Sequence, residues 1–326
     1  MGLIRKIGVI GQGHVGAHVA NSLLMQGVAD ELYLCDINER KLKSECQDFT
    51  DSMSFYPHNC KVVNCGGEYE RLACCDVVVN AAGDVAKAAG DRDGELYVTA
   101  EITRTWPRRL VDAGFGGVIV TISNPCDVVA TEIWHLTSYD PRRIIGSGTA
   151  LDSARLKNAI ARRVNLDQRS ICAYMLGEHG ASQFAAWSAV NFGGKPLAEL
   201  AAAQPDRFGF DLDECEKDAR FGGYVTYDGK GCTEYAIANA AVRLVRAVVS
   251  NEHLITACST LLTGEYGESG HFTSLPCVVG ASGVEEVVEL ELSDAEKDEL
   301  HASCEHIKGN ISRLTWWDDE RHPSLR

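Results

Sequence analysis

A glycine-rich turn close to the start is the segment that most constrains this chain. Gly11-Gln12-Gly13-His14-Val15-Gly16 directly follows the strand-like run Lys6–Ile10 and opens a helical pattern. In a strand–turn–helix unit, the first glycine permits a tight turn, the second lets the backbone approach a pyrophosphate, and the third lets the helix pack on the strand. The free N–H groups of the helix N-terminus then face the phosphates. The pattern predicts a dinucleotide site in a Rossmann-type fold.

A single acidic residue indicates which dinucleotide this turn would hold. Asp36 directly follows the strand-like run 32–35 and stands twenty residues after Gly16. At this place a carboxylate accepts hydrogen bonds from a ribose 2′-hydroxyl and repels a 2′-phosphate. We therefore predict NAD rather than NADP as the cofactor. The small residues Ala82 and Gly83, which follow a later apolar run, would leave room for the cofactor to cross the edge of the sheet.

Short apolar runs alternate with amphipathic stretches through the first half of the chain. The apolar runs are 7–10, 32–35, 62–63, 77–79, 118–122 and 144–145, and the helical patterns between them are 14–26, 39–53, 94–112 and 127–136. This alternation is typical of βαβ units, and runs without internal alternation suit strands buried on both faces of a sheet. The predicted fold class is α/β, with an N-terminal Rossmann-type, doubly wound parallel sheet.

The rhythm of the sequence changes near residue 150. The expected elements are helices over 153–164 and 233–249, short strands around 171–176, and a hairpin over 278–280 and 285–290. A polar stretch with Gly222-Gly223 lies between them, and Ser293 with Glu296 forms a capping box that starts a final amphipathic helix. We therefore predict an NAD-binding domain over residues 1–150 and an α+β substrate-binding and catalytic domain over 151–326.

Composition and charge exclude several classes of protein. The 326 residues carry a formal net charge of −15, so the chain lacks the basic footprint of a nucleic-acid binder. No apolar run reaches the ~20 residues of a membrane span, and the N-terminus leaves no room for a cleavable signal. We expect a cytoplasmic protein that binds neither nucleic acid nor membrane. Its thirteen cysteines, an odd number without the spacing of a metal pair, are expected to be reduced, buried thiols, with no bound metal.

Three further segments carry a resemblance to a known family. They are Ser123-Asn124-Pro125, Gly148-Thr149-Ala150-Leu151-Asp152-Ser153-Ala154-Arg155 and Gly177-Glu178-His179-Gly180. Together with the glycine-rich turn they resemble the L-lactate/malate dehydrogenase superfamily, from Lys6 to about Leu314. Within it the chain is most similar to the L-2-hydroxyisocaproate dehydrogenase branch, through the segments Gly90-Asp91-Arg92, Gly180-Ala181-Ser182-Gln183-Phe184 and Gly229-Lys230-Gly231-Cys232-Thr233.

The predicted chemistry is the interconversion of L-2-hydroxy acids and 2-oxo acids. This reaction needs a group that takes the hydroxyl proton in one direction and returns it in the other, and a histidine that titrates near neutrality can do both. His179, between glycines, is the candidate; its structural alternative is a histidine in a polar turn. Asp152 would orient the imidazole and stabilise its protonated form, or it simply caps the helix that follows.

Two arginines are the candidates for holding the substrate. Arg155 lies three residues after Asp152, nearly on the same helix face, where its guanidinium could hold the substrate carboxylate through two hydrogen bonds; the alternative is a surface ion pair. Arg92 lies in a loop that runs from Gly83 to Gly94 and could close over the substrate. There its charge would polarise the reacting carbonyl, and the alternative is a solvated loop arginine.

The resemblance implies further contacts around the reacting carbon. Asn124 would lie beside the reacting oxygen and the nicotinamide, Ser147 would contact the carboxamide of the nicotinamide, and Ile237 would form an apolar wall behind the ring. The complete set of predicted cofactor contacts is Gly11, Gly13, Val15, Gly16, Asp36, Ala82, Gly83, Asn124 and Ser147.

Substrate choice is predicted from two positions that the resemblance makes part of the pocket wall. Ala86 stands where malate enzymes use Arg and lactate enzymes commonly use Gln, and Thr233 stands opposite. A small Ala facing a modest Thr suggests room for a branched or aromatic side chain, as in 2-oxoisocaproate. L-lactate remains an alternative. Malate also remains one, because Lys87 next to Ala86 could supply a cation for its second carboxylate.

The resemblance further implies a homodimer or a homotetramer whose other partner is a small 2-oxo or 2-hydroxy acid. A remote alternative is a non-catalytic sensor of the NAD redox ratio, with the cysteines as its switch. Such a sensor would not need His179, Asp152, Arg155 and Arg92 together, so their joint presence favours an enzyme.

Overall fold

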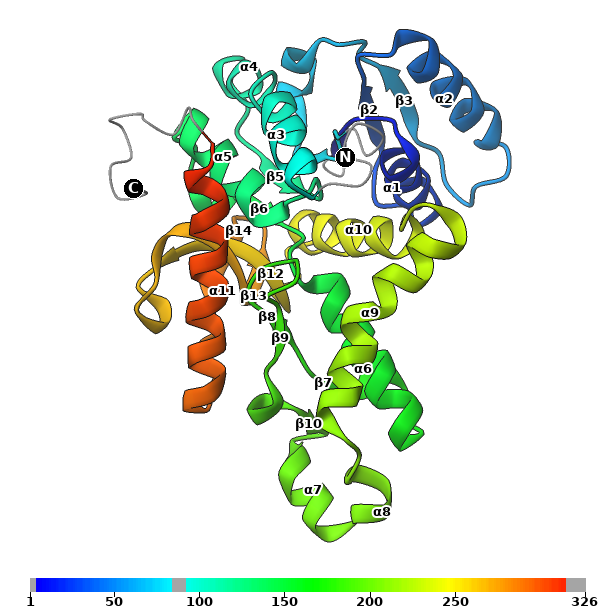
Figure 1. Ribbon diagram of the computed structural model, residues 1–326. Helices are drawn as coiled ribbons and strands as arrows, with labels where there is room; N and C mark the ends of the chain where they lie inside the picture. Colours follow the sequence, from blue (N-terminus) through cyan, green and yellow to red (C-terminus); the bar gives the residue numbers. More distant parts are fainter. Residues whose placement is uncertain (1–3, 84–91, 315–326) are drawn as a thin grey trace.

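A nine-stranded sheet organises the molecule in this computed structural model, which describes residues 4–83 and 92–314 (Figure 1). Six parallel strands form one side of it, out to the edge strand β3: β1 (Lys6–Ile10), β2 (Glu31–Cys35), β3 (Lys61–Asn64), β4 (Val77–Asn80), β5 (Val118–Thr121) and β6 (Ile144–Gly146). The strand order β6-β5-β4-β1-β2-β3 is the doubly wound arrangement of a Rossmann fold. The predicted fold class is confirmed.

Both faces of this sheet are buried, as the unalternating apolar runs predicted. On β4, Val77 and Val79 belong to one apolar cluster and Val78 to the other, because successive side chains of a strand point to opposite faces. The first cluster packs under α1 (His14–Met25), α2 (Glu39–Ser52) and α10 (Tyr235–Val249), and the second under α4 (Pro107–Asp112) and α5 (Cys126–Thr137). The carboxyl ends of the parallel strands are thereby left to carry the site.

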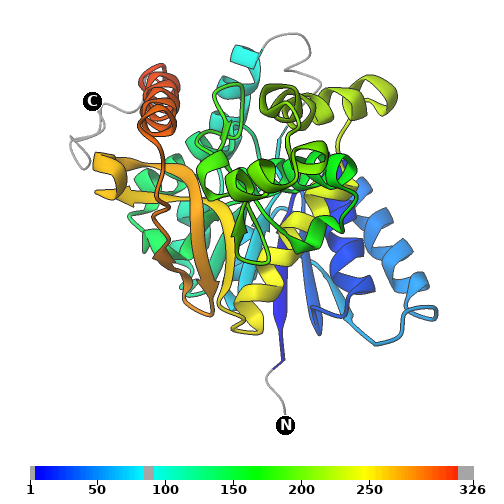
Figure 2. The same ribbon diagram turned by 90° about the horizontal axis from the view of Figure 1, so that it is seen from below.

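The second half of the chain extends the same sheet. β12 (Leu254–Thr263) and β14 (Gly283–Val287) each pair antiparallel with β13 (Ser269–Gly280), and β12 also pairs antiparallel with β6. Sequence reasoning found only the end of this unit, since it predicted a hairpin around 278–290 and no strand over β12. The β12–β13 hairpin and α11 (Asp294–Ser312) lie at one edge of the molecule, and α1 and α2 lie at the other (Figure 2).

One helical prediction was wrong, and one long helix was not predicted. The pattern over 94–112 is not one helix but two, α3 (Arg92–Thr103) and α4, because Pro107 cannot continue a helix and instead starts the next one. The polar stretch around Gly222-Gly223 is the 19-residue helix α9 (Leu212–Lys230), which Asp211 caps through the backbone N–H of Glu214 and Gly231 ends with a φ of 78°. Helix α9 packs along α6 (Ala150–Val164), so tertiary packing outweighs its low helix propensity.

Smaller elements complete the described part of the chain. The strands are β7 (Ile171–Cys172), β8 (Met175–Leu176), β9 (Phe184–Ala185), β10 (Asn191–Phe192) and β11 (Lys195–Pro196); the helices are α7 (Leu197–Ala203) and α8 (Pro205–Phe208); and the 3₁₀ turns are η1 (Tyr69–Cys74), η2 (Pro141–Arg143), η3 (Gln168–Ser170), η4 (Trp187–Ala189) and η5 (Glu265–Gly267). The capping box predicted at Ser293 and Glu296 is present at the start of α11. All thirteen cysteines are free thiols, and most of them are buried. Among the described helices, none combines the length and the apolar character needed to cross a membrane.

Candidate active site

The glycine-rich turn has the geometry that its sequence predicted. Gly11 adopts a φ of 85°, and a Cβ there would come within 2.9 Å of the backbone of Ala81. A Cβ on Gly16 would lie 1.8 Å from the carbonyl oxygen of Gly11, so only glycine lets α1 pack this closely on the turn. Around Gly13, the residue that caps α1, a Cβ would meet nothing within 4 Å. The space above Gly13 and the free N–H groups of α1 fit a pyrophosphate.

Asp36 joins the end of β2 to this turn. Its Oδ2 atom accepts a hydrogen bond from the backbone N–H of Gln12 at 2.5 Å, and its Oδ1 atom accepts one from the backbone N–H of Asn38 at 2.7 Å. A carboxylate oxygen has two lone pairs, so both oxygens can still accept from ribose hydroxyls. Asp36 thus fits its predicted role and also fixes the turn itself, which sequence reasoning did not foresee.

The turn after β4 is held by the last residue of β4 and by the loop that follows β5. The backbone N–H of Ala82 donates to the side chain of Asn80 at 3.2 Å, and the hydroxyl of Ser123 donates to the carbonyl oxygen of Ala82 at 2.7 Å. Gly83 is exposed directly after it. These bonds place Ala82 and Gly83 at the carboxyl edge of the sheet, where the predicted cofactor path runs.

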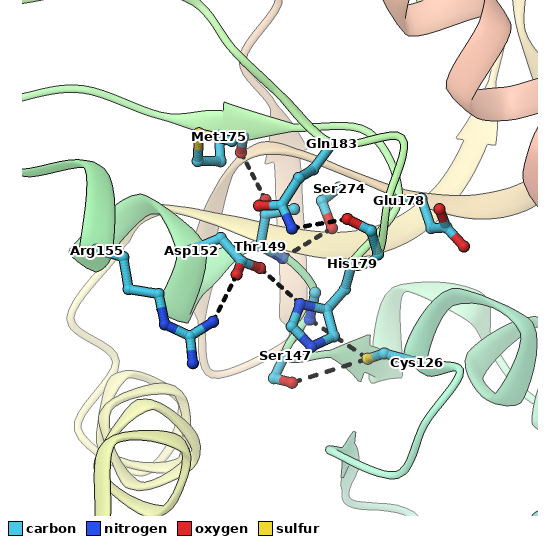
Figure 3. A network of polar contacts seen from close by, with 12 residues as sticks. Cys126, Ser147, Thr149, Asp152, Arg155, Met175, Glu178, His179, Gln183 and Ser274 are labelled. Carbon is cyan, nitrogen blue, oxygen red and sulfur yellow. Dashed lines mark hydrogen bonds and ion pairs between the residues drawn. The ribbon is translucent and has the colours of Figure 1, made fainter. Parts of the chain in front are cut away.

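A three-residue charged network lies across α6 and the loop between β8 and β9 (Figure 3). The Nδ1 atom of His179 lies 2.5 Å from Oδ2 of Asp152, and Nη1 of Arg155 lies 2.9 Å from Oδ1 of the same carboxylate. The side chain of Asp152 is 1% exposed, whereas those of His179 and Arg155 are 20% and 19% exposed. The carboxylate is therefore buried behind an imidazole and a guanidinium that still reach solvent. The capping alternative for Asp152 is wrong, because α6 begins at Ala150 after Thr149.

This network sets the protonation of its members. Burial raises the pKa of Asp152, but the charges and hydrogen bonds of His179 and Arg155 outweigh burial and lower this pKa below its usual value. Burial lowers the pKa of His179, but the charge and hydrogen bond of Asp152 outweigh it and raise this pKa above its usual value. An ionised carboxylate beside an imidazole whose pKa it raises can act as an acid–base pair.

A second buried carboxylate, which sequence reasoning missed, holds the backbone of His179. The N–H of His179 donates to Oδ2 of Asp127 at 2.8 Å, and the hydroxyl of Ser259 donates to its Oδ1 at 2.5 Å. Burial raises the pKa of Asp127 to about 6, although both hydrogen bonds oppose the shift. The available signal was an acidic residue between the apolar residues Cys126 and Val128 in the first turn of α5, since a buried, perturbed carboxylate often marks a functional site.

The loop that carries His179 is tied to β13 and α11. Gly177 exchanges two backbone hydrogen bonds of 3.1 Å with Ser274, and a Cβ on Gly177 would lie 2.5 Å from the hydroxyl of Ser303. The same hydroxyl accepts from the backbone N–H of Glu178 at 2.8 Å. Gln183 donates to the carbonyl oxygen of Gly180 at 2.8 Å and closes the loop (Figure 3). The imidazole is therefore presented by a fixed backbone.

Helix α9 covers the outer side of Arg155. A Cβ on Gly223 would lie 3.2 Å from Nη2 of Arg155, and one on Gly222 would lie 3.4 Å from its Cδ. The glycine pair thus lets the helix pass directly over the guanidinium group. This contact was invisible in the sequence, which predicted no helix around the two glycines.

The remaining predicted residues are placed as follows. Asn124 is exposed at the carboxyl end of β5, Ser147 is buried beside Cys126 with its hydroxyl 3.8 Å from the Sγ atom, and Thr233 and Ile237 are half-buried at the junction of α9 and α10. Val15 is half-buried in the first turn of α1. Arg92 is the first residue of α3, but its side chain lies outside what the structure describes, as do Ala86 and Lys87 and the residues after Leu314.

Comparison with protein-family models and with known proteins identifies the family. Residues 5–146 match the model for the lactate/malate dehydrogenase NAD binding domain, and residues 149–315 match the model for the alpha/beta C-terminal domain of the same enzymes. The chain belongs to the lactate/malate dehydrogenase family, as the resemblance predicted. The cofactor of the N-terminal half is NAD, which fits the geometry at Gly13 and Asp36.

Individual relatives cover nearly the whole chain. An L-lactate dehydrogenase of Fusobacterium nucleatum is 40% identical over 308 residues, which are 94% of this chain and 96% of the relative. L-lactate dehydrogenase 3 of Bacillus anthracis is 36% identical over 311 residues, which are 95% of this chain and 98% of the relative. The ligand-bound crystal structure of the minor L-lactate dehydrogenase from Enterococcus mundtii superposes with a TM-score of 0.90 at 33% identity, covering 96% of this chain and 99% of that one. The closer similarity to the hydroxyisocaproate branch stays a prediction.

Proposed function

We propose that this chain is an NAD-dependent L-2-hydroxyacid dehydrogenase that interconverts pyruvate and L-lactate. The observation that carries the reaction type is the network of His179, Asp152 and Arg155, in which a buried carboxylate pairs with an imidazole and a guanidinium that both reach solvent. The assignment of lactate is supported by the relatives named L-lactate dehydrogenase that cover almost the full length of the chain.

The proposed roles follow from which atoms are already engaged. Nδ1 of His179 is bonded to Asp152, so Nε2 is the atom left to exchange a proton with the substrate oxygen. Arg155 uses Nη1 for Asp152, and its other N–H groups can hold the substrate carboxylate. When bound, NADH supplies the hydride that reduces the carbonyl carbon, and NAD⁺ accepts it in the reverse direction.

Asp152 and Asp127 act in this proposal as positioning residues for His179. Asp152 fixes the ring nitrogen that carries the proton and stabilises the imidazolium that forms when a hydroxy acid is oxidised. Asp127 fixes the backbone of the same residue. The role of Arg92, to polarise the substrate carbonyl from the loop before α3, stays a prediction from the family resemblance.

The pH dependence of the two directions tests this acid–base assignment. Reduction needs protonated His179 and oxidation needs neutral His179, and Asp152 raises the pKa of that imidazole. We expect kcat/KM for the 2-oxo acid to fall as pH rises through a pKa above 6.5, and kcat/KM for the hydroxy acid to rise through the same pKa. In Asp152→Asn this pH-dependent limb of the kcat/KM profile should move to lower pH, because the neutral amide no longer stabilises the imidazolium.

The matched control for this profile is Asp167→Asn, since Asp167 pairs with Arg169 at the surface. That variant should keep the profile of the parent enzyme. A limb that stays at the same pH in Asp152→Asn would contradict the coupling of Asp152 to His179.

A second candidate substrate class is a branched or aromatic 2-oxo acid, favoured by Ala86 and Thr233 in the predicted pocket wall. The test is kcat/KM for pyruvate, oxaloacetate, 2-oxoisocaproate and phenylpyruvate with NADH. If the first candidate is right, pyruvate has the highest kcat/KM. If the second is right, a 2-oxo acid with a larger side chain has a kcat/KM higher than that of pyruvate by at most ~30- to 200-fold, the gain that burying a few more methylenes can supply. Ala86→Arg should shift activity toward oxaloacetate, and a parent enzyme that already prefers oxaloacetate would contradict both candidates.

A further inference from the structure

A second cluster of ligand-type side chains lies between β13 and α11, outside the network around His179. Glu268 directly precedes β13, His271 lies within it and Cys304 lies on α11. All three residues are buried, and one potential ligand atom from each lies within 4.8 Å of the other two. The proposed reaction uses none of them. Cys304 stands 33 residues after His271, so the spacing of the cysteines predicted no metal site here.

His271 has a hydrogen-bonding pattern that is typical of histidines in metal sites. Its side chain is fully buried, and Nδ1 lies 3.1 Å from the carbonyl oxygen of Ser269. Because a carbonyl only accepts, the proton of the neutral ring lies on Nδ1 and the lone pair lies on Nε2. Within the described structure this Nε2 atom is buried without a hydrogen-bond partner, which is costly unless something binds it. A histidine that donates one nitrogen to a backbone carbonyl and presents the other is typical of metal sites.

Two side chains of α11 hold the carboxylate of Glu268 in place. His301 lies 2.7 Å from Oε1 through its Nδ1 atom, and the Nζ atom of Lys308 donates to Oε2 at 2.6 Å. His301, Cys304 and Lys308 are spaced three and four residues apart, so they share one face of α11. Each carboxylate oxygen keeps a second lone pair. One helix face therefore supplies both a thiol ligand and the groups that hold the carboxylate ligand.

We propose that Glu268, His271 and Cys304 bind a Zn²⁺ ion between β13 and α11. Zn²⁺ takes nitrogen, sulfur and oxygen ligands together, and three protein ligands with a water as the fourth make a common coordination shell. On binding, the thiol of Cys304 releases its proton to solvent and forms the zinc–sulfur bond as a thiolate. The thiolate and the carboxylate then balance the two positive charges of the ion. Glu305, 2.9 Å from Lys308, also balances the charge of this lysine. Lys308 can therefore stay beside Glu268 when the ion binds.

The position of the site gives the ion a structural consequence. Ser303, which precedes Cys304 on α11, holds the backbone N–H of Glu178 next to His179. An ion that joins α11 to β13 would stabilise the helix that supports this loop. Because Zn²⁺ binds the folded arrangement, it should raise the melting temperature of the chain.

The experiment uses the full chain after removal of metal with a chelator. Zn²⁺ binding is measured by competition with a chromophoric chelator, and Co²⁺ is added as a spectroscopic substitute that reports thiolate coordination by its charge-transfer absorption. We expect one tight site per chain, a thiolate band with Co²⁺ and a higher melting temperature with Zn²⁺. His271→Gln and Cys304→Ser should each weaken Zn²⁺ binding by more than the ~10- to 100-fold typical of losing an outer partner, and Cys304→Ser should abolish the band.

Two control variants separate this site from other thiols. Cys232 lies beside His14 and Glu234 in a more exposed cluster, and Cys74 is an exposed thiol; Cys232→Ser and Cys74→Ser should keep both the tight site and the band. The proposal is overturned if the parent chain has no tight site, as expected if a buried water satisfies Nε2 of His271. It is also overturned if Cys232→Ser removes the band while Cys304→Ser keeps it. His271→Gln keeps the test valid if Cys304→Ser fails to fold.

Discussion

His179→Gln is expected to lower kcat by about 10²- to 10⁴-fold in both directions, the range that a positioned acid–base group contributes. Glutamine can still donate a hydrogen bond to Asp152, but its amide neither gives nor takes a proton near neutral pH. The cofactor cradle at Gly13 and Asp36 belongs to a separate part of the fold, so the affinity for NADH should not change. The measurement is kcat with saturating 2-oxo acid, together with the dissociation constant of NADH from protein fluorescence.

A matched control for this variant is His253→Gln. The side chain of His253 is 55% exposed, and its partner is Glu285, far from the charged network in the sequence. We expect this variant to keep kcat and NADH affinity within a factor of about two. Near-normal turnover of His179→Gln would exclude His179 as the acid–base group, whereas a parallel loss of NADH binding would indicate a damaged fold.

The Rossmann half was predictable because its signals are local. The glycine-rich turn, the unalternating apolar runs and Asp36 each report on a few consecutive residues whose geometry depends on their neighbours in sequence. Gly11 shows the strength of this signal, since its φ of 85° and the close backbone of Ala81 both require a glycine. Strand pairing in a βαβ unit then follows from general rules of handedness and order.

The second half was less predictable because its elements are decided by tertiary contacts. Gly222-Gly223 lowers the helix propensity of α9, yet the same two glycines let α9 pack over Arg155 and α6. In β12, buried and exposed residues follow the contacts with β6 and β13 rather than a strict alternation. The sequence alone does not show that β12 pairs with β13 or that α9 packs on Arg155, so no helix was predicted in one place and no strand in the other.

The residues of the site also differ in how far they could be predicted from local sequence. His179, Asp152 and Arg155 were found through short motifs, and the structure brings their charged atoms together. Asp127 was missed because its partners, His179 and Ser259, are 52 and 132 residues away. Asp127 is buried, whereas most aspartates lie at the surface. This burial arises only when the chain folds, so the sequence did not show it.

Arg155→Gln is expected to lower kcat/KM for every 2-oxo acid, chiefly by raising KM. The guanidinium can form two charge-assisted hydrogen bonds to the carboxylate that all these substrates share, and an amide can replace only one of them. Removing one partner of such a desolvated pair costs about 2–5 kcal/mol, or roughly 30- to 4,000-fold. The kcat/KM of Arg155→Lys should lie between those of Arg155→Gln and the parent enzyme, because an ammonium group keeps the charge but lacks the planar guanidinium fork.

The control that isolates this effect lies on the same helix. Arg163 also belongs to α6, and it pairs with Asp218 of α9 at 2.8 Å; because an exposed ion pair contributes little, Arg163→Gln should leave kcat/KM nearly unchanged. Since Arg155 also contacts Asp152, the pH limb of His179 must be measured in Arg155→Gln as well. A raised KM at every pH identifies Arg155 as the group that holds the carboxylate. An unchanged KM with a displaced pH limb would show instead that Arg155 acts only through Asp152 and His179.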